Sequence, residues 1–242
     1  MSHSVFHFRQ FTIHQDRCAM KVGTDGVLLG AWTHTGNAGR ILDIGTGTGL
    51  IALMMAQKSS ASIDAIDVDG AAAEQAHENF DESPWADRLH VIHDSIQHYS
   101  DTSSHRYDLI VSNPPYFMGA HPAPDEARNV ARHMDEHLTI EELAASTVLL
   151  LNESGRFCII LPYLEGMRFI DYASSHGLFL SRLTRVKTKS GKTEKRLLME
   201  FKNHPCKSHE DEILLQEDDG SYTGAYKKLT AEFYPKMWGG LD

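Results

Sequence analysis

Four consecutive residues, Asn113-Pro114-Pro115-Tyr116, combine an amide, two rigid rings and an aromatic ring directly after an apolar run. That run, residues 107–112, is typical of a buried parallel strand. Prolines donate no backbone hydrogen bond and restrict φ to about −65°, so they must end the strand. The tetrapeptide is therefore expected to hold an amide oxygen and a peptide carbonyl stiffly at the mouth of a strand, where both can accept hydrogen bonds.

A second candidate site is the glycine-rich stretch Asp-Ile-Gly-Thr-Gly-Thr-Gly at residues 43–49, between an expected strand and an apolar helix. Glycines permit a tight turn and close backbone approach to a ligand, and the helix N-terminus offers N–H groups. Asp67 ends the next expected strand and is placed to bind two ribose hydroxyls. Asp94 ends the third strand and could accept the exocyclic amine of an adenine. Helix capping is the alternative interpretation of both carboxylates.

The glycine spacing departs from the dinucleotide pattern G-x-G-x-x-G, although a redox Rossmann enzyme stays the alternative for this feature alone. It resembles instead the D-x-G-x-G-x-G motif of class I S-adenosylmethionine-dependent methyltransferases. The tetrapeptide at 113–116 resembles the (D/N/S)-P-P-(Y/F) motif of methyltransferases that modify exocyclic or amide nitrogens. A strand-end turn that happens to carry two prolines is the alternative here.

The resemblance implies a specific chemistry for the tetrapeptide. The N6 amine of adenine is a poor nucleophile because its lone pair is delocalised into the ring. The Asn113 side-chain oxygen and the Pro114 carbonyl would accept its two N–H bonds and turn the lone pair toward the sulfonium methyl. Pro114 and Pro115 would keep both acceptors from relaxing away. Tyr116 would stack on the base, which is worth about 1–3 kcal/mol.

The elements that must position these residues alternate along the chain. Expected strands at 40–45, 62–69, 88–94, 107–113 and 155–162 are separated by helical patterns, which predicts a parallel sheet covered on both faces. Together with the resemblance, this predicts an α/β Rossmann-like class I methyltransferase fold. Its seven-stranded, mostly parallel sheet would have strand seven antiparallel and helices on both faces. We expect residues 1–39 to pack over the cofactor site and residues 40–242 to form the methyltransferase domain, including a basic hairpin at 178–203 and a C-terminal strand and helix.

Longer segments at 8–32, 82–88 and 226–234, with the two motifs, resemble the bacterial tRNA1(Val) (adenine-N6)-methyltransferases, which methylate the adenosine 3′ of the anticodon. The resemblance implies S-adenosylmethionine as cofactor, S-adenosylhomocysteine as product and tRNA as partner. The cofactor-binding residues expected from the motifs and the resemblance are Lys21, Gly23, Thr24, Asp25, Asp43, Gly45, Thr46, Gly47, Gly49, Asp67, Val68, Asp94 and Asn113.

The formal net charge of −10 argues against a nucleic-acid partner, but the charge is unevenly spread. Residues 182–196 hold seven basic residues and one acid. Charges far from a contact face matter little beyond a Debye length, so this segment could still hold RNA. The expected RNA contacts are Arg128, Arg132, His133, Lys187, Lys189, Lys192 and Lys195. A solvated edge ribbon for 182–196 and a solvated helix for 125–133 are the alternatives.

Several classes are disfavoured. The three cysteines lack metal or redox spacing, and the H-x-x-E-H pattern at 133–137 is attributed to chance among 15 histidines, so no metal is expected. Neither a signal peptide nor a membrane-spanning run is present, which favours a cytoplasmic protein. No obligate protein partner is evident. The remaining alternatives are a protein-glutamine N5-methyltransferase acting on release factors, a ribosomal RNA guanine-N2 methyltransferase and a nucleotide-binding module without catalysis.

Overall fold

The computed structural model describes residues 4–18, 20–115 and 138–234. Within these ranges one large sheet has the strand order β10-β8-β9-β7-β6-β3-β4-β5, and β1 pairs with β2 in a separate hairpin. The strands are β1 (Val5–His7), β2 (Thr12–His14), β3 (Arg40–Ile44), β4 (Ser62–Asp67), β5 (Leu89–His93), β6 (Tyr107–Ser112), β7 (Leu151–Pro162), β8 (Phe179–Lys187), β9 (Glu194–Lys202) and β10 (His209–Leu214). The helices are α1 (Thr24–Trp32), α2 (Leu50–Lys58), α3 (Gly70–Asp81), the short 3-10 helix η1 (Ala86–Arg88), α4 (Ile96–Thr102), α6 (Ile140–Leu150), α7 (Tyr163–Ser175) and α8 (Gly224–Thr230).

The sheet confirms the predicted fold class. Strands β3 to β7 run parallel, and β9 is antiparallel to both of its neighbours, β7 and β8. The sheet extends one strand beyond the expected seven, because β10 adds to its edge in parallel with β8. Strand β7 also begins earlier than the expected residue 155, since Leu151 pairs with Tyr107 across an irregularity in the register.

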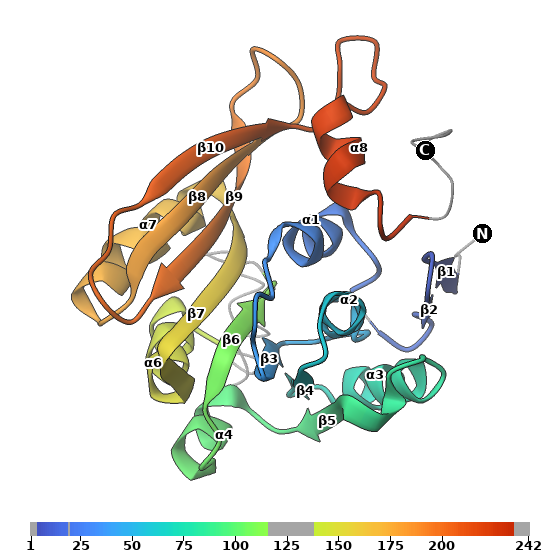
Figure 1. Ribbon diagram of the computed structural model, residues 1–242, viewed down its shortest axis with the longest axis vertical. Coiled ribbons are helices and arrows are strands. Elements are labelled where there is room, and N and C mark those ends of the chain that lie inside the picture. Colours follow the sequence, from blue (N-terminus) through green and yellow to red (C-terminus); the bar gives the residue numbers. More distant parts are fainter. Residues whose placement is uncertain (1–3, 19, 116–137, 235–242) are drawn as a thin grey trace, which may run out of the picture.

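Helices cover both faces of the sheet (Figure 1). Helices α1, α2 and α3 contribute to one apolar core, and α4, α6 and α7 contribute to the other. The central strands are buried on both sides, which explains why they are nearly continuous apolar runs in the sequence. Helix α2 is apolar almost throughout because it is enclosed between α1 and the sheet.

Local signals explain where several elements begin and end. Helix α6 begins with a capping box, in which the Thr139 hydroxyl accepts from the Glu142 N–H and the Glu142 carboxylate accepts from the Thr139 N–H. Gly177 follows α7 with a φ of 88°, a left-handed conformation that favours glycine. No helix in the described ranges is long and apolar enough to span a membrane.

The topology brings three functional segments to one edge. The carboxyl ends of parallel strands meet at the same edge of a sheet. The glycine turn follows β3, Asp67 ends β4 and Asn113 follows β6. Helix α1 packs against α2 and begins close to Asn113, because a Cβ added to Gly26 would lie 3.9 Å from the Asn113 Nδ2. The N-terminal segment thus lies beside the end of β6.

Candidate active site

The glycine turn after β3 leaves space for a ligand at one position and for a neighbouring ring at another. Gly45, Gly47 and Gly49 all have left-handed φ values, 69°, 55° and 82°. A Cβ added to Gly45 would meet no protein atom within 4 Å, so that glycine opens onto free space. A Cβ added to Gly49 would lie 2.4 Å from the Phe80 ring. Gly49 therefore makes room for packing by α3 and does not line the cavity described below.

Asp43 supports this turn from underneath. Its side chain is fully buried, and its Oδ2 accepts hydrogen bonds from the Thr46 hydroxyl at 2.7 Å and the Ala52 N–H at 3.1 Å. The Asp43 Oδ1 has no hydrogen-bond partner within the described part of the chain. Burial raises the pKa of Asp43 to about 7 against an ordinary value of 3.8. Asp43 was expected among the cofactor-binding residues; it instead ties the turn to the start of α2.

The end of β4 places Asp67 beside the turn. Its carboxylate accepts the Gly47 N–H at 2.8 Å and the Asp69 N–H at 3.0 Å. Burial raises the pKa of Asp67. Helix α3 is capped by Asp69, whose side chain accepts from the Ala71 N–H, so the capping alternative for Asp67 is wrong. The next residue, Val68, is 58% exposed and presents an apolar surface at the strand end.

Asp94 follows β5 at the same edge. Its backbone N–H donates to the Asp67 carbonyl at 3.1 Å. Its side chain accepts from the Ser95 N–H at 2.7 Å and lies 2.7 Å from the His98 Nδ1. Helix α4 is capped by Ser95 rather than by Asp94. The Asp94 carboxylate therefore supports the start of α4 from the position before the cap.

A cavity of about 470 Å³ lies between the glycine turn and the start of α1. This volume is in the range of small-ligand sites. The lining residues are Met20, Lys21, Val22, Gly23, Thr24, Asp25, Gly26, Gly45, Thr46, Gly47, Thr48, Leu50, Ile51, Asn113 and Arg196. The structure thus brings the expected N-terminal residues, the glycine turn and Asn113 together. Asp67, Val68 and Asp94 lie outside this lining, on the neighbouring strand ends.

The structure describes the first three residues of the proline tetrapeptide, Asn113, Pro114 and Pro115. Asn113 is half-buried and lines the cavity, Pro114 is buried and Pro115 is exposed. The Ser112 hydroxyl donates to the Ile44 carbonyl at 2.9 Å, which fixes the end of β6 against the end of β3. Tyr116 lies outside the described residues. The cavity beside Asn113 is open, as the predicted chemistry requires.

Arg196 is a lining residue that was not expected there. It belongs to β9, where it pairs in register with Pro162 at the carboxyl end of β7. Its Nε donates to the Asp25 Oδ2 at 2.7 Å. The sequence marks Arg196 only as one charge in a basic segment, since its place in the cavity depends on the pairing of β9 with β7.

Part of the basic segment pairs with acidic residues of β10. Arg185 is paired with Glu210 at 3.1 Å, and Lys187 is paired with Glu212 at 2.9 Å. The Lys189 Nζ donates to the Asp218 carbonyl at 3.2 Å. Lys192 and Lys195 are exposed near the hairpin tip. The other expected RNA contacts, Arg128, Arg132 and His133, lie outside the described residues.

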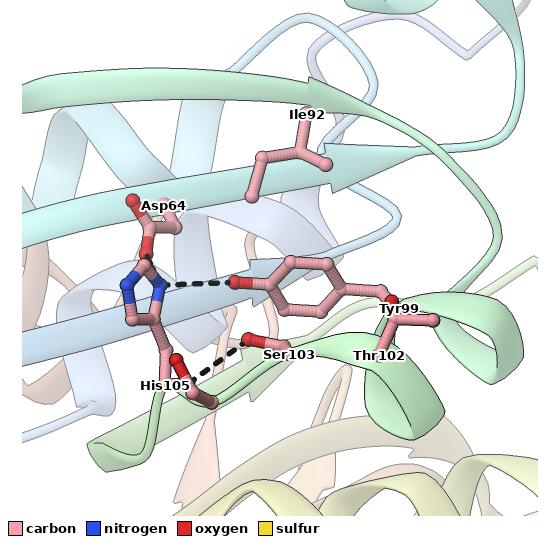
Figure 2. Close-up of a pocket in the computed structure, with 7 residues that line it drawn as sticks. Asp64, Ile92, Tyr99, Thr102, Ser103 and His105 are labelled. Atoms are coloured by element: carbon pink, nitrogen blue, oxygen red, sulfur yellow. Dashed lines mark hydrogen bonds and ion pairs between the residues drawn. The ribbon is translucent and has the colours of Figure 1, made fainter.

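A second hollow lies beneath α4, away from the glycine turn (Figure 2). The Asp64 Oδ2 accepts from the Tyr107 hydroxyl at 2.7 Å and from the Arg40 Nε at 3.1 Å. The Tyr99 hydroxyl lies 2.6 Å from that of Tyr107 and 3.5 Å from the His105 Nδ1. These polar groups satisfy one another, as is usual for a buried structural network. Within the described ranges, no cluster of three or more histidine, cysteine or carboxylate side chains could hold a metal ion.

The chain is similar to a known protein family and to solved structures of the same fold. Residues 20–159 match the family model of the methyltransferase small domain. Among solved structures, a predicted O-methyltransferase from Agrobacterium tumefaciens has a TM-score of 0.67 at 17% identity, covering 86% of this chain and 96% of that one. A Thermus thermophilus 16S rRNA N2 G1207 methyltransferase, solved with its cofactor and guanosine, has a TM-score of 0.54 at 16% identity, covering 79% and 47%. These two likenesses concern the fold alone.

The fold and the family match define a class I S-adenosylmethionine-dependent methyltransferase. A Bacteroides fragilis protein is 49% identical over 98% of this chain and 100% of its own length, and one from Tolumonas auensis is 44% identical over 96% and 97%. Both are named tRNA1(Val) (adenine(37)-N6)-methyltransferase. The chain belongs to this family of methyltransferases.

The described residues fit the cofactor of the family. A Cβ at Gly45 would project into open space, so the absence of a side chain there leaves room for a ligand. Leu50 and Ile51 give the cavity an apolar wall, and Lys21, Asp25 and Arg196 add charges of both signs. S-adenosylmethionine carries apolar methylene groups beside its sulfonium as well as a charged amino-acid group, so this mixed lining suits it.

Proposed function

We propose that this protein transfers a methyl group from S-adenosylmethionine to N6 of an adenine in tRNA, the adenosine 3′ of the anticodon of tRNA1(Val). One observation carries the proposal. Asn113, held by Ser112 at the end of β6, lines the same cavity as the open glycine turn. An amide oxygen at that position can orient an amine next to the cofactor. A tRNA substrate would make the cytoplasm its place of action.

In this proposal the protein orients the amine and does not need a strong base, because the nitrogen becomes cationic as the N–CH3 bond forms and the S–CH3 bond breaks, and it can then release an N–H proton to water. The cofactor supplies an electrophilic methyl group on a sulfonium. The Asn113 Oδ1 and the Pro114 carbonyl would accept the two N–H bonds of the adenine amine, which directs the nitrogen lone pair toward the cavity. Pro114 is buried and Pro115 follows it, so the two acceptors are held before the substrate arrives. Tyr116 would stack on the adenine ring.

The remaining site residues would each bind a different part of the cofactor. Asp67 would bind the ribose hydroxyls, Val68 would cover the adenine and Asp94 would accept from its exocyclic amine. The amino-acid end would lie among the cavity residues Lys21, Gly23, Thr24, Asp25, Gly45, Thr46 and Gly47. Asp43 and Gly49 would act indirectly, since the first supports the turn and the second admits Phe80.

The RNA would cross the edge of the sheet next to Asn113. An adenosine in the anticodon loop is already unpaired, so its extrusion costs little compared with flipping from a duplex. Lys187, Lys189, Lys192 and Lys195 would contact the backbone, with Arg128, Arg132 and His133 near the target base. The exposed Lys192 and Lys195 are the strongest of these candidates, because Lys187 already pairs with Glu212.

The test is to incubate the protein with total tRNA and tritiated S-adenosylmethionine and to map the labelled nucleoside. We expect N6-methyladenosine at the position 3′ of the anticodon. A tRNA1(Val) transcript with guanosine at that position is the matched control and should take up no label. A release-factor fragment and ribosomal RNA serve as competing acceptors. Label in a glutamine amide or in guanine N2 would contradict the proposal and favour one of those alternatives.

A further inference from the structure

Arg196 occupies an unusual place for a residue of the basic segment. Its guanidinium lies in the cavity wall, where its Nε donates to Asp25 at 2.7 Å and its Nη1 donates to the Lys195 carbonyl at 2.9 Å. The two charged side chains are mostly buried, with 27% of Arg196 and 19% of Asp25 exposed. A charge pair in such a position holds its geometry more firmly than one in open water. It connects the start of β9 to the start of α1.

The charges of the cavity wall favour an anionic ligand group. Among the described residues, the charged side chains in the lining are Lys21, Asp25 and Arg196, so positive charge exceeds negative charge by one in this part of the wall. The other lining groups are backbone, hydroxyls, apolar side chains and the Asn113 amide. A carboxylate entering this space would be attracted by the wall, and partial burial strengthens that attraction.

The strand order indicates which end of the cofactor enters the cavity. The strands lie in the order β6-β3-β4-β5, and the proposed nucleoside contacts, Asp67 and Asp94, follow β4 and β5. In the proposed reaction the methyl group would face Asn113, which follows β6, and the nucleoside would lie toward β4 and β5. The amino-acid group is attached to the sulfur on the side opposite the nucleoside. It would therefore enter the cavity between the glycine turn and α1, which Arg196 lines.

We propose that Arg196 binds the α-carboxylate of the cofactor, and that Asp25 is a positioning residue that orients its guanidinium. A guanidinium has five N–H donors in a planar fork that matches a carboxylate, so it can bind a ligand carboxylate while it keeps Asp25 and the Lys195 carbonyl. The inference rests on the cofactor assignment and on the proposed place of the nucleoside.

Two ligands isolate this contact in a calorimetric binding experiment. S-adenosylhomocysteine carries the amino-acid group, whereas 5′-methylthioadenosine has the same nucleoside and sulfur without it. We expect Arg196→Gln to weaken S-adenosylhomocysteine binding by about 10- to 100-fold, the worth of a charge-assisted pair. The affinity for 5′-methylthioadenosine should change by less than about twofold, which also reports that the variant is folded. Lys202→Gln, at the far end of β9, is the matched control and should change neither affinity.

Further variants sharpen the assignment. Arg196→Lys keeps the charge without the fork and should give an intermediate loss for S-adenosylhomocysteine. Asp25→Asn should weaken the same ligand less than Arg196→Gln does, and the double variant should lose less than the product of the two single losses. This non-additivity is expected only if Asp25 acts through Arg196.

Three results would overturn the inference. Equal weakening of both ligands would place Arg196 at the nucleoside or in the fold. Unchanged binding of S-adenosylhomocysteine together with weaker tRNA binding would show that the guanidinium contacts a phosphate instead. Failure of the unaltered protein to bind either ligand would overturn the cofactor assignment itself, and is distinguishable because it precedes any substitution.

Discussion

Two buried aspartates on neighbouring strands have different surroundings. Asp43 in β3 and Asp64 in β4 are both nearly inaccessible, and their strands pair directly, with Leu42 opposite Asp64. The Asp64 carboxylate belongs to a network with Arg40 and Tyr107. The Asp43 carboxylate holds the glycine turn through one oxygen, and its other oxygen has no partner within the described residues.

The difference separates a structural polar site from one that supports function. The network of Asp64 lies under α4, where the Arg40 Nε and the Tyr107 hydroxyl share the Asp64 Oδ2, as is usual for a buried structural cluster. Asp43 lies under a turn whose glycines open onto a cavity with Asn113 in its wall. A buried carboxylate and a nearby hollow are common to both regions, and what marks the region of Asp43 is the glycine turn and Asn113 in the cavity wall.

The largest effect is expected from Asn113→Ala. Removal of a preorganised acceptor should slow methyl transfer to tRNA by about 10²- to 10³-fold. The affinity for S-adenosylhomocysteine should stay nearly the same, because Asn113 is one of many lining residues. Single-turnover kinetics and calorimetry measure the two quantities. Unchanged turnover would refute the role of Asn113. The region around Asp43 would then no longer differ from that around Asp64 in supporting catalysis.

Asp64→Ala tests the structural side. It leaves Arg40 and the Tyr107 hydroxyl without their shared acceptor, and we expect a loss of about 2–4 kcal/mol in the free energy of unfolding. The estimate lies below that for a fully buried pair because Arg40 is 34% exposed and can reach water. Urea denaturation gives the stability. The S-adenosylhomocysteine affinity of the folded variant should be unaltered, and a marked loss would show that the two regions are coupled.

Asp67→Ala should weaken S-adenosylhomocysteine binding by about 1–3 kcal/mol, through loss of the ribose acceptor and of the hydrogen bond that holds the Gly47 N–H. Asp67→Asn is the matched control, since it keeps an acceptor for Gly47 and should give a smaller loss. Calorimetry distinguishes the variants. An affinity equal to that of the unaltered protein would discard the ribose assignment.

The stability of the protein should depend on pH through Asp43. Its folded-state pKa of about 7 exceeds its ordinary value of 3.8, so between these values the folded state binds more protons than the unfolded chain. The free energy of unfolding should therefore fall as pH rises from 4 toward 7, by about 1–2 kcal/mol between pH 5 and 7, and level off above. Denaturation curves of Asp43→Asn should be flatter over this interval. Parallel curves for the two proteins would contradict the assignment.

The smallest effect concerns the basic hairpin. Replacing Lys192 and Lys195 by Gln should lower the slope of log affinity for tRNA against log salt by roughly 1–2, since each phosphate contact contributes about 0.7–0.9. Replacing Lys187 and Lys189 should change the slope less, because Glu212 and the Asp218 carbonyl already bind them. Filter binding at several salt concentrations measures both pairs. An unchanged slope for both would mean that the RNA docks elsewhere.

Much of this fold could be predicted because its signals are local. Helix α2 follows the glycine stretch, as predicted, and β3, β4, β5 and β6 differ from prediction by one or two terminal residues. Apolar periodicity and the glycine and proline breakers determine such elements without reference to the rest of the chain. Helix α4 and the β1–β2 hairpin were not predicted, since short polar elements carry little periodicity.

The sequence by itself determined the glycine turn, the proline tetrapeptide and the alternation of strands and helices along the chain, because each depends on neighbours in the sequence. Only the tertiary structure decided that Asp43 supports the turn, that Gly49 makes room for Phe80, and that acidic residues of β10 pair with Arg185 and Lys187 of the basic hairpin. The tertiary structure alone brought Arg196 to Asp25, which lies 171 residues earlier in the sequence. The physical reason is that side-chain orientation and charge pairing depend on which strands become neighbours, and that choice is made by burial of two apolar faces rather than by any local pattern.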